Sequence, residues 1–66
     1  MSDVETLENE IKRLSARAIA AEMNLHDLAE HWPADRRSIT DAARATREAY
    51  ASLESARERL AASETA

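Results

Sequence analysis

The stretch IKRLSARAIAAEMNLHDLAEHWP, which runs from Ile11 to Pro33, decides the fold. It carries apolar residues at alternating intervals of three and four, a second apolar group on the opposite face, and the only proline of the chain. Intervals of three and four bring residues to one side of an α-helix, and the residue before a proline is pushed out of the helical region. The stretch therefore predicts one long helix that ends near residue 31.

The same spacing continues to both ends of the chain, and we call the residues that follow it the a/d seam. Before the proline the seam consists of Val4, Leu7, Ile11, Leu14, Ala18, Ala21, Leu25, Leu28 and Trp32. After the proline it consists of Ile39, Ala42, Thr46, Ala49, Leu53, Ala56, Leu60 and Ser63. These are the a and d positions of a heptad repeat, which indicates helices packed along their length.

Local signals mark the ends of the two helices. Ser2 and Glu5 form a capping box, in which each side chain serves an otherwise unpaired backbone N–H. Asp35 is the expected N-cap of the second helix, with Ser38 as the alternative start. A connection this short makes the helices antiparallel neighbours. We predict a single domain over residues 1–66, with a first helix at about 3–31, a turn at about 32–35 and a second helix at about 36–62, after which the chain frays.

Folding at the proline places large seam residues opposite small ones. Leu28 faces Ala42, Leu14 faces Ala56, and the layers interdigitate. The same register pairs Leu25 with Thr46, Ala18 with Leu53 and Ala21 with Ala49. Seven of the seventeen seam positions are Ala, Ser or Thr, and there is no cysteine for a disulfide. Small chains with so little apolar surface usually need a partner. We therefore predict an all-α, antiparallel two-helix hairpin that dimerises into a four-helix bundle, with a dimer of dimers as the alternative.

A second apolar stripe supports that alternative. Ile19, Met23 and Ala16 lie nearly opposite the a/d seam, and their grouping favours a further helix–helix contact over scattered surface residues. Tyr50 flanks the seam, where its ring packs and its hydroxyl reaches water. The predicted oligomer interface comprises Leu7, Ile11, Leu14, Ala18, Ile19, Ala21, Met23, Leu25, Leu28, Trp32, Ile39, Thr46, Ala49, Tyr50, Leu53 and Leu60.

Composition excludes several classes of function. The absence of cysteine rules out thiolate metal sites, and the absence of glycine rules out Gly-rich phosphate loops.

The acidic, periodic N-terminus is unlike a signal peptide, and no apolar run is long enough to span a membrane, so we expect a cytoplasmic protein without a cofactor. Serines lie beyond helical reach of a histidine and a hairpin offers no cleft, so we expect no enzyme.

The two histidines are candidate metal ligands. Glu22, His26 and Glu30 share one stripe of a helix, while Asp27 lies one turn from His31. Such pairs supply half a metal site that a second subunit would complete, through His26 in particular, or they are solvated surface pairs. The second interpretation is favoured, because no dense cluster of ligands is present.

The arginines form the one basic concentration. Arg36, Arg37, Arg44 and Arg47 lie within twelve residues, opposed there only by Asp41. RNA-binding bundles use such a surface on phosphates. A solvated face is favoured instead, because the net charge is −4 and no aromatic stacking platform accompanies the arginines.

Several segments together resemble one family. They are KRLSARA at residues 12–18, Met23, LHDLAE at 25–30, Pro33, Ile39, Ala43, Thr46 and EAY at 48–50. This set resembles the Rop-like family of small proteins encoded among nitrogen-fixation genes, without gaps from about residue 7 to residue 60.

The resemblance implies a helical hairpin that associates into bundles and a role accessory to nitrogenase. The expected function is a non-enzymatic protein-interaction module in nitrogenase assembly or protection, with itself and a nitrogenase-related protein as partners. His26, Asp27 and Glu30 lie in the LHDLAE segment, and they form the candidate partner surface.

Overall fold

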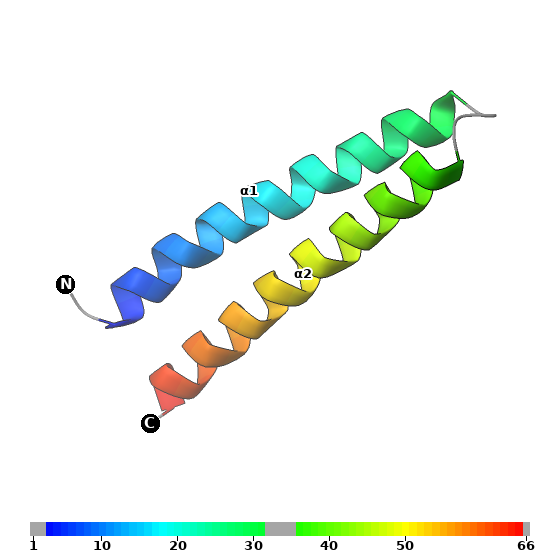
Figure 1. Cartoon of the computed structure of the whole chain (residues 1–66). Helices are drawn as coiled ribbons and strands as arrows, with labels where there is room; N and C mark the ends of the chain where they lie inside the picture. Colours follow the sequence, from blue (N-terminus) through cyan, green and yellow to red (C-terminus); the bar gives the residue numbers. More distant parts are fainter. Residues whose placement is uncertain (1–2, 32–35, 66) are drawn as a thin grey trace.

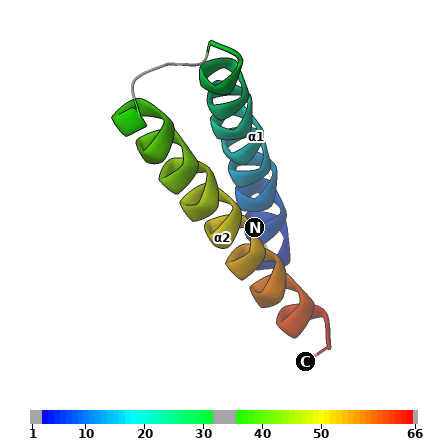
Figure 2. The same ribbon diagram turned by 90° about the vertical axis from the view of Figure 1, so that its right-hand side faces the viewer.

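Two antiparallel helices make up the fold. The computed structural model describes residues 3–31 and 36–65. Helix α1 spans Asp3–Glu30 and helix α2 spans Arg36–Thr65. Every described residue except His31 belongs to one of these helices, so the predicted all-α hairpin is confirmed. Figure 1 shows the helices side by side along their whole length, with both chain ends at one end of the hairpin. Figure 2 shows that the two helices cross one another rather than running strictly parallel.

The ends of the helices differ slightly from the predicted ones. Helix α1 stops one residue early, where the His31 backbone N–H donates to the Leu28 carbonyl at 3.3 Å and tightens the last turn. Helix α2 continues three residues beyond residue 62. Ala61 and Ala62 favour helix, and no glycine or proline stops it. The predicted signals at Ser2, Trp32, Pro33 and Asp35 lie outside the described residues.

The core is small and follows the predicted register. Among described residues only Leu14, Ala18, Ala42, Leu53 and Ala56 are buried. Four of them form one cluster, with Ile11 and Ala49 packed against it. The four residues of the predicted pairs Ala18–Leu53 and Leu14–Ala56 all lie in this cluster, as the predicted register requires. An alanine facing a leucine lets the two backbones approach closely, which keeps these few residues dry.

Of the other described positions of the a/d seam, Ser63 is exposed and the rest are only half-buried. The half-buried positions are Val4, Leu7, Ile11, Ala21, Leu25, Leu28, Ile39, Thr46, Ala49 and Leu60. One polar member, Thr46, donates its hydroxyl to the Ala42 carbonyl at 2.8 Å, so it is compatible with further burial. The hairpin therefore leaves most of its apolar seam partly accessible to solvent.

Candidate interaction surfaces

A cluster of potential ligands lies on the last turns of α1. His26, Asp27 and Glu30 are all exposed, and each offers one ligand atom within 4.8 Å of the others. His26 Nδ1 lies 3.6 Å from Glu30 Oε1, one helical turn away. We call these three residues the turn-end cluster. Side-chain exposures of 71% and 61% leave the His26–Glu30 pair screened by water, so it adds little to stability.

The structure changes two of the predicted pairs near this cluster. His31 Nδ1 donates to the backbone carbonyl of Asp27 at 2.8 Å, rather than to its carboxylate. Helix C-termini leave carbonyls without partners, and a histidine in the following residue satisfies one of them. Glu22 accepts a hydrogen bond from Tyr50 of α2. Asp27, rather than Glu22, therefore joins His26 and Glu30.

The turn-end cluster has the composition of half a cation site. One imidazole nitrogen and two carboxylates suit zinc and other borderline divalent metals. Three groups from a single helix leave the remaining coordination positions to water or to a second molecule. His31 uses Nδ1 on the backbone, so it stands apart from this set.

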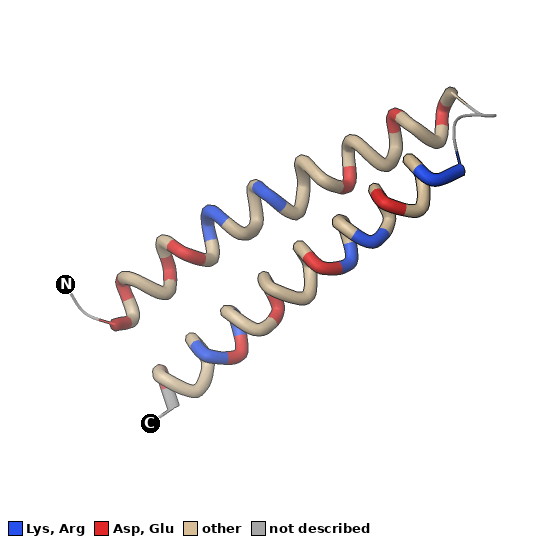
Figure 3. The backbone as a smooth tube through the Cα atoms, viewed as in Figure 1, with Lys and Arg blue, Asp and Glu red and all other residues tan. Residues whose placement is uncertain are grey.

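The four arginines occupy the first half of α2. Arg36, Arg37, Arg44 and Arg47 are all exposed. At 3.6 residues per turn, they fall within an arc of about 100° on the helix. No acidic residue lies in the first turn of α2, so the positive end of the helix dipole adds to their potential. Figure 3 shows this basic concentration next to the turn, whereas acidic residues dominate the facing part of α1.

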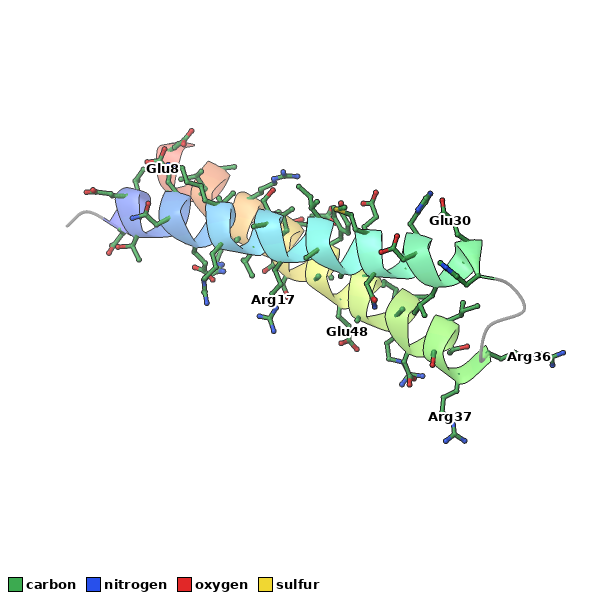
Figure 4. The ribbon with its side chains drawn as sticks, turned by 90° about the horizontal axis from the view of Figure 1, so that it is seen from above. Glu8, Arg17, Glu30, Arg36, Arg37 and Glu48 are labelled. Atoms are coloured by element: carbon green, nitrogen blue, oxygen red, sulfur yellow. The ribbon has the colours of Figure 1, made fainter. Side chains whose placement is uncertain are left out.

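The two surfaces at the turn point in different directions. Figure 4 shows Glu30 projecting from α1 to one side and Arg37 projecting from α2 to the opposite side, with Arg36 directed outward from the end. A partner that covers the turn-end cluster therefore need not contact the arginines. The structure brings together the three residues of the predicted partner surface and keeps them separate from the predicted RNA surface.

Two links across the helices were not predicted. The Tyr50 hydroxyl donates to Glu22 Oε1 at 2.5 Å, and Arg59 lies 3.2 Å from Glu10 Oε1 in an ion pair. The hydrogen bond to Glu22 is the largest cause of a raised pKa of Tyr50, with desolvation and the Glu22 charge adding to it. Both links join heptad positions that flank the a/d seam. The predicted register already places these residues next to one another, so it could have been used to predict both links.

A shallow groove runs between the helices on one face. Its best-defined part has a volume of about 290 Å³ and is lined mainly by short side chains at its floor. Ala21 and Ala49, predicted to approach closely, both line it. Two further hollows continue it past Glu10 and Arg59 toward the chain ends. The seam residues that line the groove and its extensions are Leu7, Leu14, Ala21, Ala49 and Ser63.

The predicted oligomer interface divides into three groups. Leu14, Ala18 and Leu53 are already buried inside the hairpin, and Trp32 lies outside the described residues. Ile19, Met23 and Tyr50 are exposed. The other predicted interface residues are the half-buried ones, namely Leu7, Ile11, Ala21, Leu25, Leu28, Ile39, Thr46, Ala49 and Leu60.

Comparison with known proteins decides the family. The sequence model of the Rop-like family matches residues 2–65. The chain belongs to the Rop-like family. This membership agrees with the hairpin, and it covers both helices and the turn.

Curated relatives of this Rop-like chain are UPF0437 proteins. One from Azorhizobium caulinodans is 50% identical over 60 residues, covering 91% of this chain and 87% of the relative. One from Sinorhizobium fredii is 42% identical, covering 97% and 96%. A third, from Nostoc sp., is 39% identical, covering 89% and 83%. No solved structure matches the chain. Within the described residues, neither helix is long and apolar enough to cross a membrane.

Proposed function

We propose that this protein is a non-enzymatic accessory protein of nitrogen fixation. It acts in the cytoplasm as an oligomeric helical bundle that binds a protein partner in nitrogenase assembly or protection. The observation that carries the oligomeric part is the half-buried a/d seam, whose leucines and isoleucines on both helices remain partly exposed to solvent. A second hairpin laid on these residues completes a four-helix bundle.

The area of accessible surface supports self-association. The chain exposes 5128 Å², whereas a compact monomeric protein of its mass exposes about 4,200 Å². The excess is comparable to the roughly 800 Å² that each partner contributes to a stable interface.

The character of the polar groups supports a binding role over catalysis. Within the described part of the chain, no polar or charged residue is buried. Catalysis relies on positioned groups in a site from which water is excluded. The described grooves are shallow and solvated, whereas a protein partner needs an exposed surface such as the turn-end cluster.

The sequence resemblance, rather than the names of the curated relatives, is what supports the link to nitrogen fixation and the choice of surface. The Rop-like resemblance is to small proteins encoded among nitrogen-fixation genes, and the turn-end cluster lies in LHDLAE, the segment on which the resemblance depends most. Its three residues are exposed and lie close together on α1, and Figure 4 shows that Glu30 projects away from α2. We assign the nitrogenase-related partner to this surface.

Binding to purified nitrogenase components and to purified nitrogenase assembly proteins tests the proposal. We expect saturable binding by the wild type, and at least a tenfold loss of affinity in a variant with Asp27→Ala and Glu30→Ala. The matched control is Glu54→Ala, which removes an exposed acid from α2 and should bind as the wild type does. Binding of none of these proteins would overturn the partner, and equal binding by the cluster variant would overturn the surface.

A second candidate function is the carriage of a divalent cation. It is favoured by one observation, the convergence of a nitrogen and two carboxylate ligands within 4.8 Å. Titration with Zn²⁺ alone tests it, and His26→Ala should abolish binding. His31→Ala is the control, because His31 Nδ1 is bound to the backbone and should not contribute. Unchanged stoichiometry in His26→Ala would eliminate that residue as a ligand.

A further inference from the structure

A second regular pattern runs along the outside of α1. Its members are Lys12, Ala16, Ile19, Met23, His26 and Glu30. Their intervals alternate between four and three, as in the a/d seam, and at 3.6 residues per turn they lie within about 80° of one another. We call these six residues the outer stripe. It faces nearly away from the a/d seam, so α2 covers none of it.

Among the described residues, the centre of the outer stripe holds the most exposed large apolar side chains. Ile19 is 51% exposed and Met23 is 62% exposed, and of the described large hydrophobic residues only Tyr50 is also classed as exposed. Tyr50 has its hydroxyl on Glu22, but neither Ile19 nor Met23 has a polar group that would favour contact with water. Two neighbouring apolar side chains on a heptad spacing form a seam for another helix.

The chemistry of the outer stripe is complementary to itself when reversed. In an antiparallel pair of α1 helices with the two-fold axis level with Ala21, Ile19 faces Met23 of the second copy. In the same register Ala16 faces His26, a small residue against a large one. Lys12 faces Glu30 at each end, so opposite charges meet.

Residues beside the outer stripe extend this complementarity. Arg13 and Asp27 flank it on one side, with the small Ala20 between them. The antiparallel arrangement brings Arg13 toward Asp27 of the second copy and lets the backbones approach at Ala20. A parallel arrangement would instead place Lys12 beside Lys12 and Glu30 beside Glu30, which is unfavourable.

We propose that the outer stripe is a second, antiparallel interface with another copy of this chain, built on the Ile19–Met23 contact and closed by Lys12–Glu30 ion pairs. It is separate from the a/d seam, and two self-complementary contacts on one chain are what a dimer of dimers requires. The outer stripe shares His26 and Glu30 with the turn-end cluster, so a second copy and the nitrogenase-related partner would occupy this end of α1 in turn. A membrane surface is a less suitable partner for the outer stripe. Helices that lie on membranes carry basic residues beside their apolar face, whereas the outer stripe ends in the acidic Glu30.

Sedimentation velocity of the purified chain tests the interface. The wild type is expected to show a species that Met23→Glu removes, with the sedimenting mass falling by half and the helical circular dichroism unchanged. Met23→Leu is the matched control, and it should keep the larger species. The same experiment tests the a/d-seam dimer separately. If the a/d seam forms a dimer, Met23→Glu should sediment as a dimer; if it does not, Met23→Glu should sediment as a monomer. Equal masses for the wild type and Met23→Glu would overturn the interface.

Charge exchange tests the register. Lys12→Glu and Glu30→Lys should each weaken the larger species, because each leaves like charges opposed at both ends. The double variant should recover it, because each end again pairs a lysine with a glutamate. Recovery is not expected of a merely structural effect on the hairpin. Failure of the double variant to recover association would overturn the Lys12–Glu30 pairing.

Cysteine substitution tests the direction, since the chain has no cysteine of its own. A mixture of Ile19→Cys and Met23→Cys chains should form the mixed disulfide faster than either variant forms a disulfide with itself. A parallel contact gives the reverse result, because identical positions then lie opposite one another. Faster self-disulfides would therefore overturn the antiparallel arrangement.

Discussion

Tyr50 joins the two helices from the side of the hairpin, and its protonation state matters to that contact. The hydroxyl donates to Glu22, and this bond is the largest cause of a pKa raised above 10.0. A group whose pKa is higher in the folded state favours folding while it is protonated. The contact therefore contributes below about pH 10 and is lost as the pH rises through the folded-state pKa of Tyr50.

The phenolate titration of Tyr50 gives a clean test, because the chain has only one tyrosine. We expect a midpoint above that of free tyrosine, and Glu22→Ala should lower it. Arg57→Ala should raise it further, because the Arg57 charge lowers the pKa of Tyr50. The measurement is the ultraviolet absorbance of the phenolate against pH. A midpoint that Glu22→Ala leaves unchanged would contradict the assigned cause.

Ala18 and Ala56 show how little space the core contains. Both are 0% exposed, and they pack with Leu14 and Leu53. Small residues at these sites set the distance between the helices, and a larger side chain must push the helices apart.

Enlarging Ala18 is therefore expected to destabilise the protein. Ala18→Leu should lower the free energy of unfolding by about 1–3 kcal/mol, as overpacking typically does. Urea denaturation followed by circular dichroism measures this. Ala43→Leu adds the same side chain at an exposed position of α2 and should change the free energy by less than about 0.5 kcal/mol. Equal effects of the two substitutions would contradict the close approach at Ala18.

At the scale of the helices, the heptad spacing was enough to predict the fold. Both helices, their antiparallel packing and the clustering of Leu14, Ala18, Leu53 and Ala56 follow from periods of three and four and from one proline. Backbone periodicity determines which residues share a face, and that is why these predictions are confirmed. It also placed His26 and Glu30 together on α1.

Spacing along the sequence did not predict which of several nearby groups a polar side chain would bind. Asp27 and His31 are one turn apart, but the carbonyl at the end of α1 competes for the imidazole and binds it. Glu22 had His26 within reach on α1, but it accepts from Tyr50 of α2. In both cases the outcome depends on where a helix ends or on what the facing helix presents. A list of intervals within one helix contains neither fact.

The four arginines in the first half of α2 allow a test between a protein-binding role and an RNA-binding role. We expect no saturable binding of structured RNA at low salt, because the net charge is −4 and the described aromatic residue, Tyr50, is committed to Glu22. Fluorescence anisotropy at two salt concentrations measures this. Tight binding at low salt that Arg44→Glu and Arg47→Glu both weaken would contradict the expectation and favour the RNA alternative.

At the scale of the whole molecule, the hairpin is a thin rod. It measures 49 × 15 × 12 Å and has a radius of gyration of 15.1 Å, whereas a compact chain of this length has about 11 Å. A rod one helix pair thick has no interior beyond the line where the helices touch. That geometry explains why so few residues are buried and why most of the a/d seam is half-exposed.

This shape makes stability depend on concentration. If folding and association along the a/d seam are coupled, mass action favours the folded state as protein concentration rises. We therefore expect the thermal midpoint to increase steadily with concentration.

Leu25→Glu, which places a charge on a half-buried seam position, should lower the midpoint and abolish its concentration dependence. Met23→Glu lies on the outer face and should preserve the dependence. The measurement is circular dichroism during heating at several protein concentrations. A cooperative transition with one midpoint at every concentration would mean that a single hairpin is stable alone, and the bundle proposed from the exposed seam would be wrong.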